Sequence, residues 1–94
     1  MKDLIYEDFK KYEIPQQPLW EGICHVFLFP NGYGASVIKH LYSYGGKNDL
    51  FELAVIKGTP EDWDLCYDTK VANDVIGYLE NDKVLNYLEQ IKNL

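Results

Sequence analysis

The chain of 94 residues contains no arginine, only two cysteines and no long hydrophobic run. Arginine forms the forked hydrogen bonds that read phosphates and base edges, so its absence argues against direct nucleic-acid binding. Cys24 and Cys66 are too few for a disulfide framework and lie among apolar residues, as reduced cysteines do. The start of the chain lacks the apolar stretch of a signal peptide, and no segment reaches the length of a membrane span. These absences predict a cytoplasmic protein without membrane contact.

Acidic residues are also missing from one long stretch. Fifteen Asp and Glu stand against nine Lys, giving a net charge of −6, yet no acid occurs between Gly22 and Asn48. Acids gather instead at residues 61–68 and 74–82. We therefore expect one acidic side and one nearly neutral side, the acidic side serving either solubility or a functional contact.

Length and composition fit one small globular domain. A hydrophobic content of 47%, with eight Tyr, four Phe and two Trp, excludes a disordered chain. We divide the chain into an N-terminal arm, residues 1–19, and a single domain, residues 20–94.

The arm is expected to form a short amphipathic helix. Asp3 is a candidate N-cap, and three apolar residues follow at helical spacing: Ile5, Phe9 and Tyr12. Pro15 and Pro18 then end the helix. The arm therefore either packs back on the domain or docks on a partner.

The strongest local signal is a hairpin turn at residues 30–32, Pro-Asn-Gly, between two β-forming runs. Because proline has no N–H to close a two-residue loop, we favour a three-residue loop with Gly32 in the left-handed conformation. This loop predicts three facing pairs: Phe29 with Tyr33, Phe27 with Ala35 and His25 with Val37. A slip by one residue would change every pair.

Two more strands and two helical segments are expected downstream. Residues 50–56 form a strand, and residues 63–68 alternate as a half-buried fourth strand with Trp63, Leu65 and Tyr67 on one side. Asn73 can cap a short helical turn over 74–79, and Asn81 a longer helix to the end of the chain. The longer helix carries an apolar stripe, formed by Val84, Leu85, Leu88 and Ile91.

These elements predict an α+β fold: a four-stranded antiparallel β-meander packed on a C-terminal helix, with a short N-terminal helical arm. A single helix covers only one sheet face. We expect the other face, with members of the set Phe27, Tyr33 and Val37, to have no cover within the domain. The arm, a second copy or a partner would then meet this face.

No motif carries a recognised chemistry. The Tyr44–Lys47 segment lacks the spacing of a phosphate-binding loop and precedes a strand, so we interpret it as a turn. His25 and His40 do not show the paired spacing of structural metal ligands. Cys66 has acidic neighbours that disfavour a thiolate, and the acids are interpreted as solvated. We predict a protein that is not an enzyme and that uses no metal or cofactor.

Tyrosine and glycine combine at residues 33–34 and 42–46, a composition typical of contact surfaces. We expect these stretches to lie close together at the ends of strands; the alternative is ordinary strand-edge tyrosines. The predicted partner-binding residues are Tyr33, Tyr42, Tyr44, Phe27 and Lys47.

Several runs combine into a family resemblance. They are FPNGYGASVI at 29–38, YSYGG at 42–46, FELAV at 51–55, LCYDT at 65–69 and DVIGYL at 74–79. Together they resemble small uncharacterised proteins of bacteriophages and prophages over about residues 20–94. The resemblance implies a phage origin and brings no activity or binding residues. Lys70 stands where such proteins usually have proline, which leaves the start of the predicted short helix less rigid.

Three hypotheses of function follow. The first is a small interaction protein, phage-encoded, that binds a host or phage protein through an aromatic surface. The second is an acidic mimic of nucleic acid that inhibits a DNA- or RNA-binding protein, which predicts binding that weakens steeply with salt. The third is a homodimer that binds a small ligand at its shared face.

Overall fold

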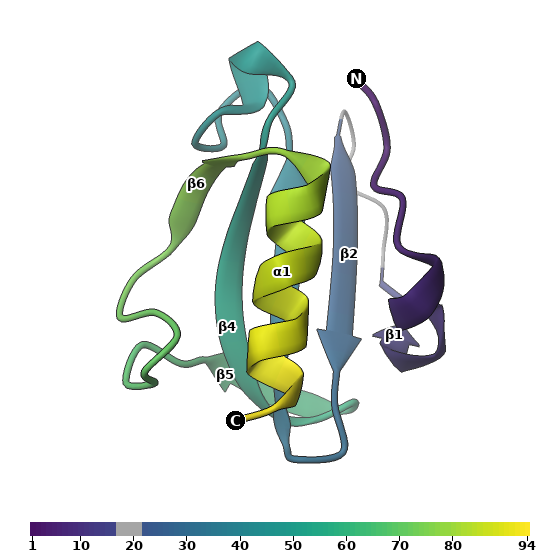
Figure 1. The fold of residues 1–94 in the computed structure, drawn as a ribbon, viewed down its shortest axis with the longest axis vertical. Coiled ribbons are helices and arrows are strands. Elements are labelled where there is room, and N and C mark those ends of the chain that lie inside the picture. The colour runs from purple at the N-terminus through teal and green to yellow at the C-terminus, as the bar shows by residue number, and fades with distance from the viewer. Residues whose placement is uncertain (17–21) are drawn as a thin grey trace.

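The computed structural model describes residues 1–16 and 22–94, and it shows an antiparallel β-sheet packed against one α-helix (Figure 1). The elements, in chain order, are the 3₁₀ helix η1 (Glu7–Tyr12), β1 (Glu13–Ile14), β2 (Ile23–Leu28), β3 (Tyr33–Lys39), the 3₁₀ helix η2 (Gly46–Asn48), β4 (Phe51–Thr59), β5 (Asp62–Leu65), β6 (Ile76–Leu79) and α1 (Asn81–Lys92). The α+β class and the C-terminal helix are confirmed.

The sheet is larger than the predicted four-stranded meander. The meander is present as β2, β3, β4 and β5, paired consecutively and antiparallel. Two short strands are added, because β1 pairs with β2 and β6 pairs with the first part of β4. Since β5 pairs with the last part of β4, the long strand β4 has two different partners along one edge.

The turn at residues 30–32 has the predicted three-residue form. Gly32 is left-handed, with φ +84°, and the Phe29 N–H donates to the Tyr33 carbonyl at 2.8 Å. The strand register then pairs Phe27 with Ala35 and His25 with Val37, as expected.

Asn31 in this turn also contacts the helix. Its side-chain oxygen accepts the Tyr33 N–H, and its amide group donates to three carbonyls at the end of α1. These are the carbonyls of Ile91, Lys92 and Leu94, at 3.0 to 3.3 Å. Carbonyls at a helix C-terminus have no partner within the helix, so one turn residue satisfies groups that the helix leaves open.

The core lies between α1 and the facing side of the sheet. The predicted helical stripe is confirmed, with Val84, Leu88 and Ile91 fully buried and Leu85 packed beside them. From the sheet, the core takes alternate residues of the three central strands, which are Phe27, Ala35, Val37, Phe51, Leu53 and Val55. The expectation of an uncovered face with Phe27 and Val37 was wrong, because the strand register brings both onto the side that α1 covers.

The N-terminal arm packs back on the sheet beside β2 (Figure 1). Phe9 and Leu4 are buried, and the rings of Phe9 and Tyr12 stand edge-on to Phe29 at 6.3 and 5.0 Å. Two details of the predicted arm helix were wrong. The helix is a 3₁₀ turn that begins at Glu7, and the Asp3 carboxylate is bound to Leu4 and His25 in place of capping it.

The segment at residues 74–79, predicted as a short helix, is instead the strand β6. It pairs with β4, placing Leu79 opposite Phe51, and the Tyr78 N–H donates to the Tyr44 carbonyl. The available edge of β4 therefore overrode the local helical pattern. The helix α1 likewise starts without a side-chain cap from Asn81, whose amide group is bound to the arm backbone at Ile5.

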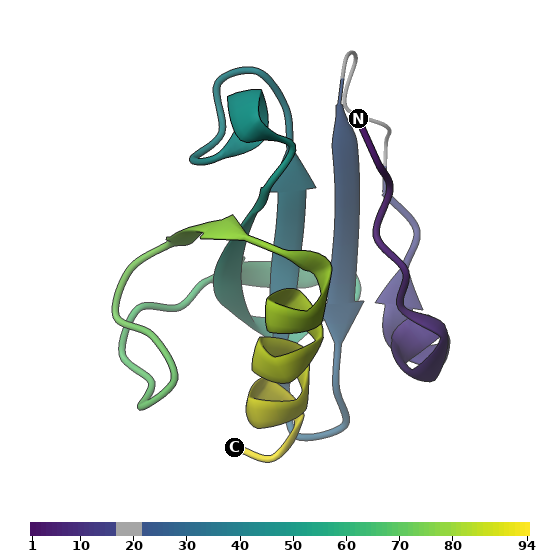
Figure 2. The same cartoon turned by 45° about the horizontal axis from the view of Figure 1, so that its top comes forward.

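The fourth strand, β5, is shorter and less buried than expected. It ends at Leu65, which is 51% exposed, and Tyr67 beyond it is also exposed. Gly58 has φ +143°, and the end of β4 turns so that its hairpin with β5 crosses behind the sheet (Figure 2). This hairpin lies away from α1, so its alternating pattern does not face the core.

Replacing Gly77 with alanine distinguishes the strand from the predicted helix. In a helix the substitution would stabilise the protein by about 1 kcal/mol. In β6 an added Cβ would lie 2.4 Å from the Tyr44 Cβ, so we expect Gly77→Ala to lower the free energy of unfolding by about 1–3 kcal/mol. Urea denaturation measures the difference, and a stabilised variant would contradict the strand.

Candidate functional site

The structure separates the five predicted partner-binding residues. Phe27 is fully buried, so its assignment to a contact surface was wrong. Tyr33 begins β3 at the hairpin end of the sheet, where Lys57 lies over its ring at 5.1 Å. Tyr42, Tyr44 and Lys47 lie together in the loop at the opposite end of β3 (Figure 1). The expectation that the tyrosine stretches at 33–34 and 42–46 lie close together was therefore also wrong.

The loop end of the sheet carries a group of exposed apolar side chains, which we call the aromatic tip. Its members are Leu41, Tyr42, Tyr44 and Tyr78, with exposed fractions between 50% and 83%. Tyr78 joins the group because β6 lies against the loop, with its N–H bound to the Tyr44 carbonyl at 3.0 Å. Four large side chains exposed at one end of a small domain form a surface suited to contact.

The backbone of the tip is held in one conformation by hydrogen bonds. Ser43 Oγ accepts the His40 N–H and donates to the His40 carbonyl, at 3.0 and 2.9 Å. The Tyr44 N–H donates to Glu52 on β4, and the Tyr42 N–H donates to the His40 ring. A loop fixed before binding loses little conformational entropy when a partner docks.

Close packing and an unusual backbone angle also mark the tip. Tyr78 has φ +58°, a left-handed conformation that is uncommon for an aromatic residue. Its backbone lies against Gly45, where an added Cβ would be 2.8 Å from the Tyr78 Cα. Non-glycine residues in this conformation cost free energy and occur often at functional sites.

The acidic side lies along β5, β6 and the segment between them. Seven acids occur between residues 61 and 82 against Lys70 alone, and the remaining eight acids of the chain are matched by eight lysines. The whole net charge of −6 therefore comes from this part of the chain. All seven acids are exposed, and none joins an ion pair with another residue of 1–16 or 22–94.

His25 is the centre of a polar cluster that the sequence did not predict. Its Nδ1 lies 2.6 Å from Glu13 Oε2 and its Nε2 lies 2.7 Å from Asp3 Oδ1. The Tyr6 hydroxyl donates to the other oxygen of Glu13, and burial together with this bond raises the pKa of Tyr6 to about 12. Since both ring nitrogens are engaged by carboxylates, the imidazole has no free nitrogen to act as a general base.

Lys39 forms a second polar cluster next to the first. Its side chain is 1% exposed, and Nζ donates to Asp49 Oδ1 at 2.9 Å and to the Lys2 carbonyl at 2.7 Å. Nζ also lies 3.8 Å from the centre of the Phe51 ring. The bond to Lys39 is the main reason that the pKa of Asp49 is lowered. A buried ammonium group with these partners is satisfied and structural.

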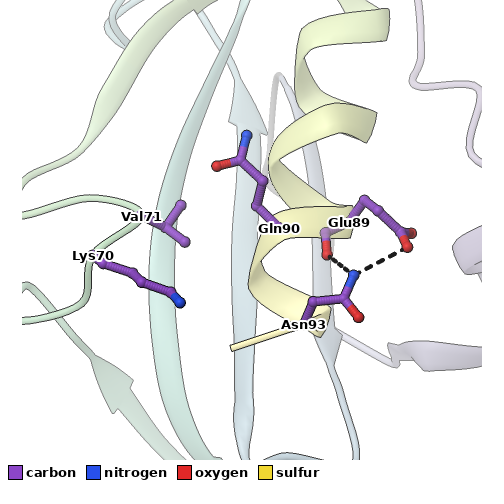
Figure 3. Close-up of a pocket in the computed structure, with 5 residues that line it drawn as sticks. All are labelled: Lys70, Val71, Glu89, Gln90 and Asn93. Atoms are coloured by element: carbon purple, nitrogen blue, oxygen red, sulfur yellow. Dashed lines mark hydrogen bonds between the residues drawn. The ribbon is translucent and has the colours of Figure 1, made fainter.

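A surface cleft of about 410 Å³ lies between α1 and the segment before β6 (Figure 3). Its lining residues are Lys70, Val71, Glu89, Gln90 and Asn93. The Asn93 side chain is turned toward its own helix, where it donates to the carbonyl and the carboxylate of Glu89. The two ionisable residues of this lining, Lys70 and Glu89, form no ion pair with each other, and Glu89 pairs with Lys92. Across the described ranges, 1–16 and 22–94, no three His, Cys, Asp or Glu side chains are grouped to bind a metal ion.

Comparison of the chain with protein-family models, with curated proteins and with solved structures finds no match in any of the three. Among the helices in the described part of the chain, none has the length and apolar character needed to cross a bilayer.

Sequence reasoning missed Tyr78 and the partners of His25. Tyr78 was assigned to a helix, and only the pairing of β6 with β4 brings it to the tip. Asp3 and Glu13 are 22 and 12 residues from His25 in the chain, and no local spacing links such distant positions. The available signal was the acidic character of an otherwise amphipathic arm.

The thiol of Cys66 gives a test of the local electrostatics. The Cys66 Sγ donates a hydrogen bond to Asp68 Oδ1 at 2.9 Å, and this hydrogen bond to a carboxylate raises the pKa of Cys66. We expect Asp68→Asn to lower that pKa and to speed alkylation of Cys66 by iodoacetamide at pH 8 by up to about tenfold. Peptide mapping measures the rate, and Asp64→Asn is the matched control. Equal rates in both variants would contradict the role of Asp68.

Proposed function

We propose that this protein is a small, non-enzymatic, phage-encoded interaction protein that binds a host or phage protein through the aromatic tip. The observation that carries the proposal is the grouping of Leu41, Tyr42, Tyr44 and Tyr78 as exposed side chains on a hydrogen-bonded loop. Tyrosine gives a large amphipathic contact area and loses few rotatable bonds on binding.

Charge supports the same assignment. The stretch from Gly22 to Asn48, which supplies most of the tip, has no acid, and Lys47 is its only exposed charge. A contact centre that carries few charges loses little hydration when a partner covers it. The resemblance to small phage and prophage proteins supports the proposed origin, and a cytoplasmic location is part of the proposal.

The aromatic tip can be tested by partner capture. The tagged protein and the variant Tyr42→Ser/Tyr44→Ser/Tyr78→Asn are used to capture proteins from lysate of the source cell, with washes at low and high salt. Asn is chosen at position 78 because it tolerates the left-handed backbone. We expect a partner that survives high salt and whose recovery falls about tenfold or more in the variant, as for hot-spot tyrosines.

Tyr67→Ser is the matched control, since Tyr67 is an exposed tyrosine that lies outside the tip. Its partner recovery should equal that of the unmodified protein. Unchanged recovery with the tip variant would overturn the assignment of this surface.

The unpaired acids favour a second candidate, an acidic mimic of nucleic acid that occupies a DNA- or RNA-binding protein. The seven exposed carboxylates at 61–82 have no lysine partner within the described ranges. For a mimic, binding would weaken steeply with salt, and Asp62→Asn/Asp64→Asn/Asp68→Asn would abolish capture while the tip variant would not. Partner recovery that changes neither with salt nor with these three substitutions would exclude mimicry.

A further inference from the structure

Three polar side chains of the arm gather around one histidine of the sheet. Asp3, Tyr6 and Glu13 all belong to residues 1–14, and all three converge on His25 of β2 either directly or through Glu13. The His25 side chain is 12% exposed, and the Tyr6 ring lies 4.7 Å from it. The two carboxylates approach the ring from two points of the arm, one before η1 and one after it.

This arrangement requires the charged form of the ring. Each carboxylate accepts a hydrogen bond from one ring nitrogen, and only an imidazolium has N–H groups on both. Neutral histidine would turn a lone pair toward either Asp3 or Glu13, leaving an acceptor opposite a carboxylate at about hydrogen-bond distance. One of the two contacts between His25 and the carboxylates would then be repulsive and no longer attractive.

Polar and aromatic groups surround His25 from the arm and from the sheet. The arm presents Asp3, Glu13 and the Tyr6 hydroxyl, and the Phe27 ring of β2 lies 6.3 Å from the imidazole. The ammonium of Lys39 on β3 acts on the Asp3 carboxylate. Partial burial disfavours the imidazolium, but the hydrogen bonds to Asp3 and Glu13 outweigh it, and the pKa of His25 is raised above its usual 6.5.

The arm is also held by contacts that do not involve this ring, among them the pairing of β1 with β2. The Asn81 amide group accepts from the Ile5 N–H at 2.7 Å and donates to the Ile5 carbonyl at 2.9 Å. Lys39 donates to the Lys2 carbonyl. The amide of Asn81 has no charge to lose near neutral pH, so this anchor provides a natural reference for an effect that depends on His25.

We propose that protonated His25 is a latch that holds residues 1–14 on the sheet, and that loss of this proton releases them from β2. Release moves the rings of Tyr6, Phe9 and Tyr12 away from Phe27 and Phe29, which they now contact. The device would couple the pH of the surroundings to the exposure of apolar surface beside β2.

The pH dependence of arm docking follows from the raised pKa of His25. A histidine whose pKa is higher in the docked state stabilises that state fully below the ordinary value of 6.5. This stabilisation is lost as the pH rises through the raised pKa. The arm is therefore expected to be docked in mildly acidic solution and to loosen on the alkaline side of 6.5.

An NMR titration of the full chain from pH 5 to 9 tests the latch. The imidazole resonance of His25 gives its midpoint, the Leu4 methyl and Phe9 ring resonances report docking, and the Leu53 and Val55 methyl resonances report the core. We expect His25 to titrate above 6.5 and the undocked population of the arm to rise about tenfold with the same midpoint, as for loss of one charge-assisted hydrogen bond. The core resonances should stay constant.

Three variants separate the latch from general destabilisation. His25→Gln should remove the pH-dependent step. Asp3→Asn should reduce it, because the contact between His25 and Glu13 remains, and Asp3 is exposed enough for its variant to fold. Asn81→Ala should undock the arm more at every pH and leave the midpoint unchanged. The latch is overturned if the Leu4 and Phe9 resonances do not change as His25 titrates, or if the core resonances change together with those of the arm. It is also overturned if the pH-dependent step persists in His25→Gln, or if His25 titrates below 6.5.

Discussion

The register of the hairpin at residues 30–32 is the constraint on which the rest of the molecule depends. Side chains alternate between the two faces of a strand, so a slip by one residue would place Phe27 on the opposite face of the sheet from Ala35 and Val37. Gly32 fixes the loop length through its left-handed backbone, and Asn31 binds the last carbonyls of α1. The same three-residue turn thus sets which face becomes the core and ties the helix that covers it.

A single helix then explains why the arm is part of the fold. A helix with side chains is about 10–12 Å wide and strands are about 4.8 Å apart, so one helix covers little more than two strands. In this protein α1 packs chiefly over β3 and β4. The rings on β2 need another cover, and Phe9, Tyr12 and Tyr6 supply it. Because the arm is short, polar contacts at Lys2, Asp3 and Ile5 supplement its small apolar contact.

The sheet presents two surfaces that act through different forces. The aromatic tip has little charge and a preformed backbone, and contact there would be driven by burial of apolar area. The acidic side has the whole net charge on exposed carboxylates, and its field acts at longer range and is screened by salt. The two surfaces approach each other at β6, since Tyr78 belongs to the tip and Glu80, on the acidic side, follows the strand directly.

Elements with local signals could be predicted from the residues alone. The Pro-Asn-Gly turn specifies its own loop, the stripe on α1 has a helical period, and the acids of residues 61–82 are separated from the neutral stretch before them. Only the tertiary structure decided the positions of Phe27, Tyr78 and His25. Phe27 became core because of the strand register, Tyr78 reached the tip because β4 offered a free edge, and His25 met two carboxylates from a distant segment. Periodicity reports which side chains share a face, whereas contacts between distant segments depend on which surfaces remain to be covered once the core has formed.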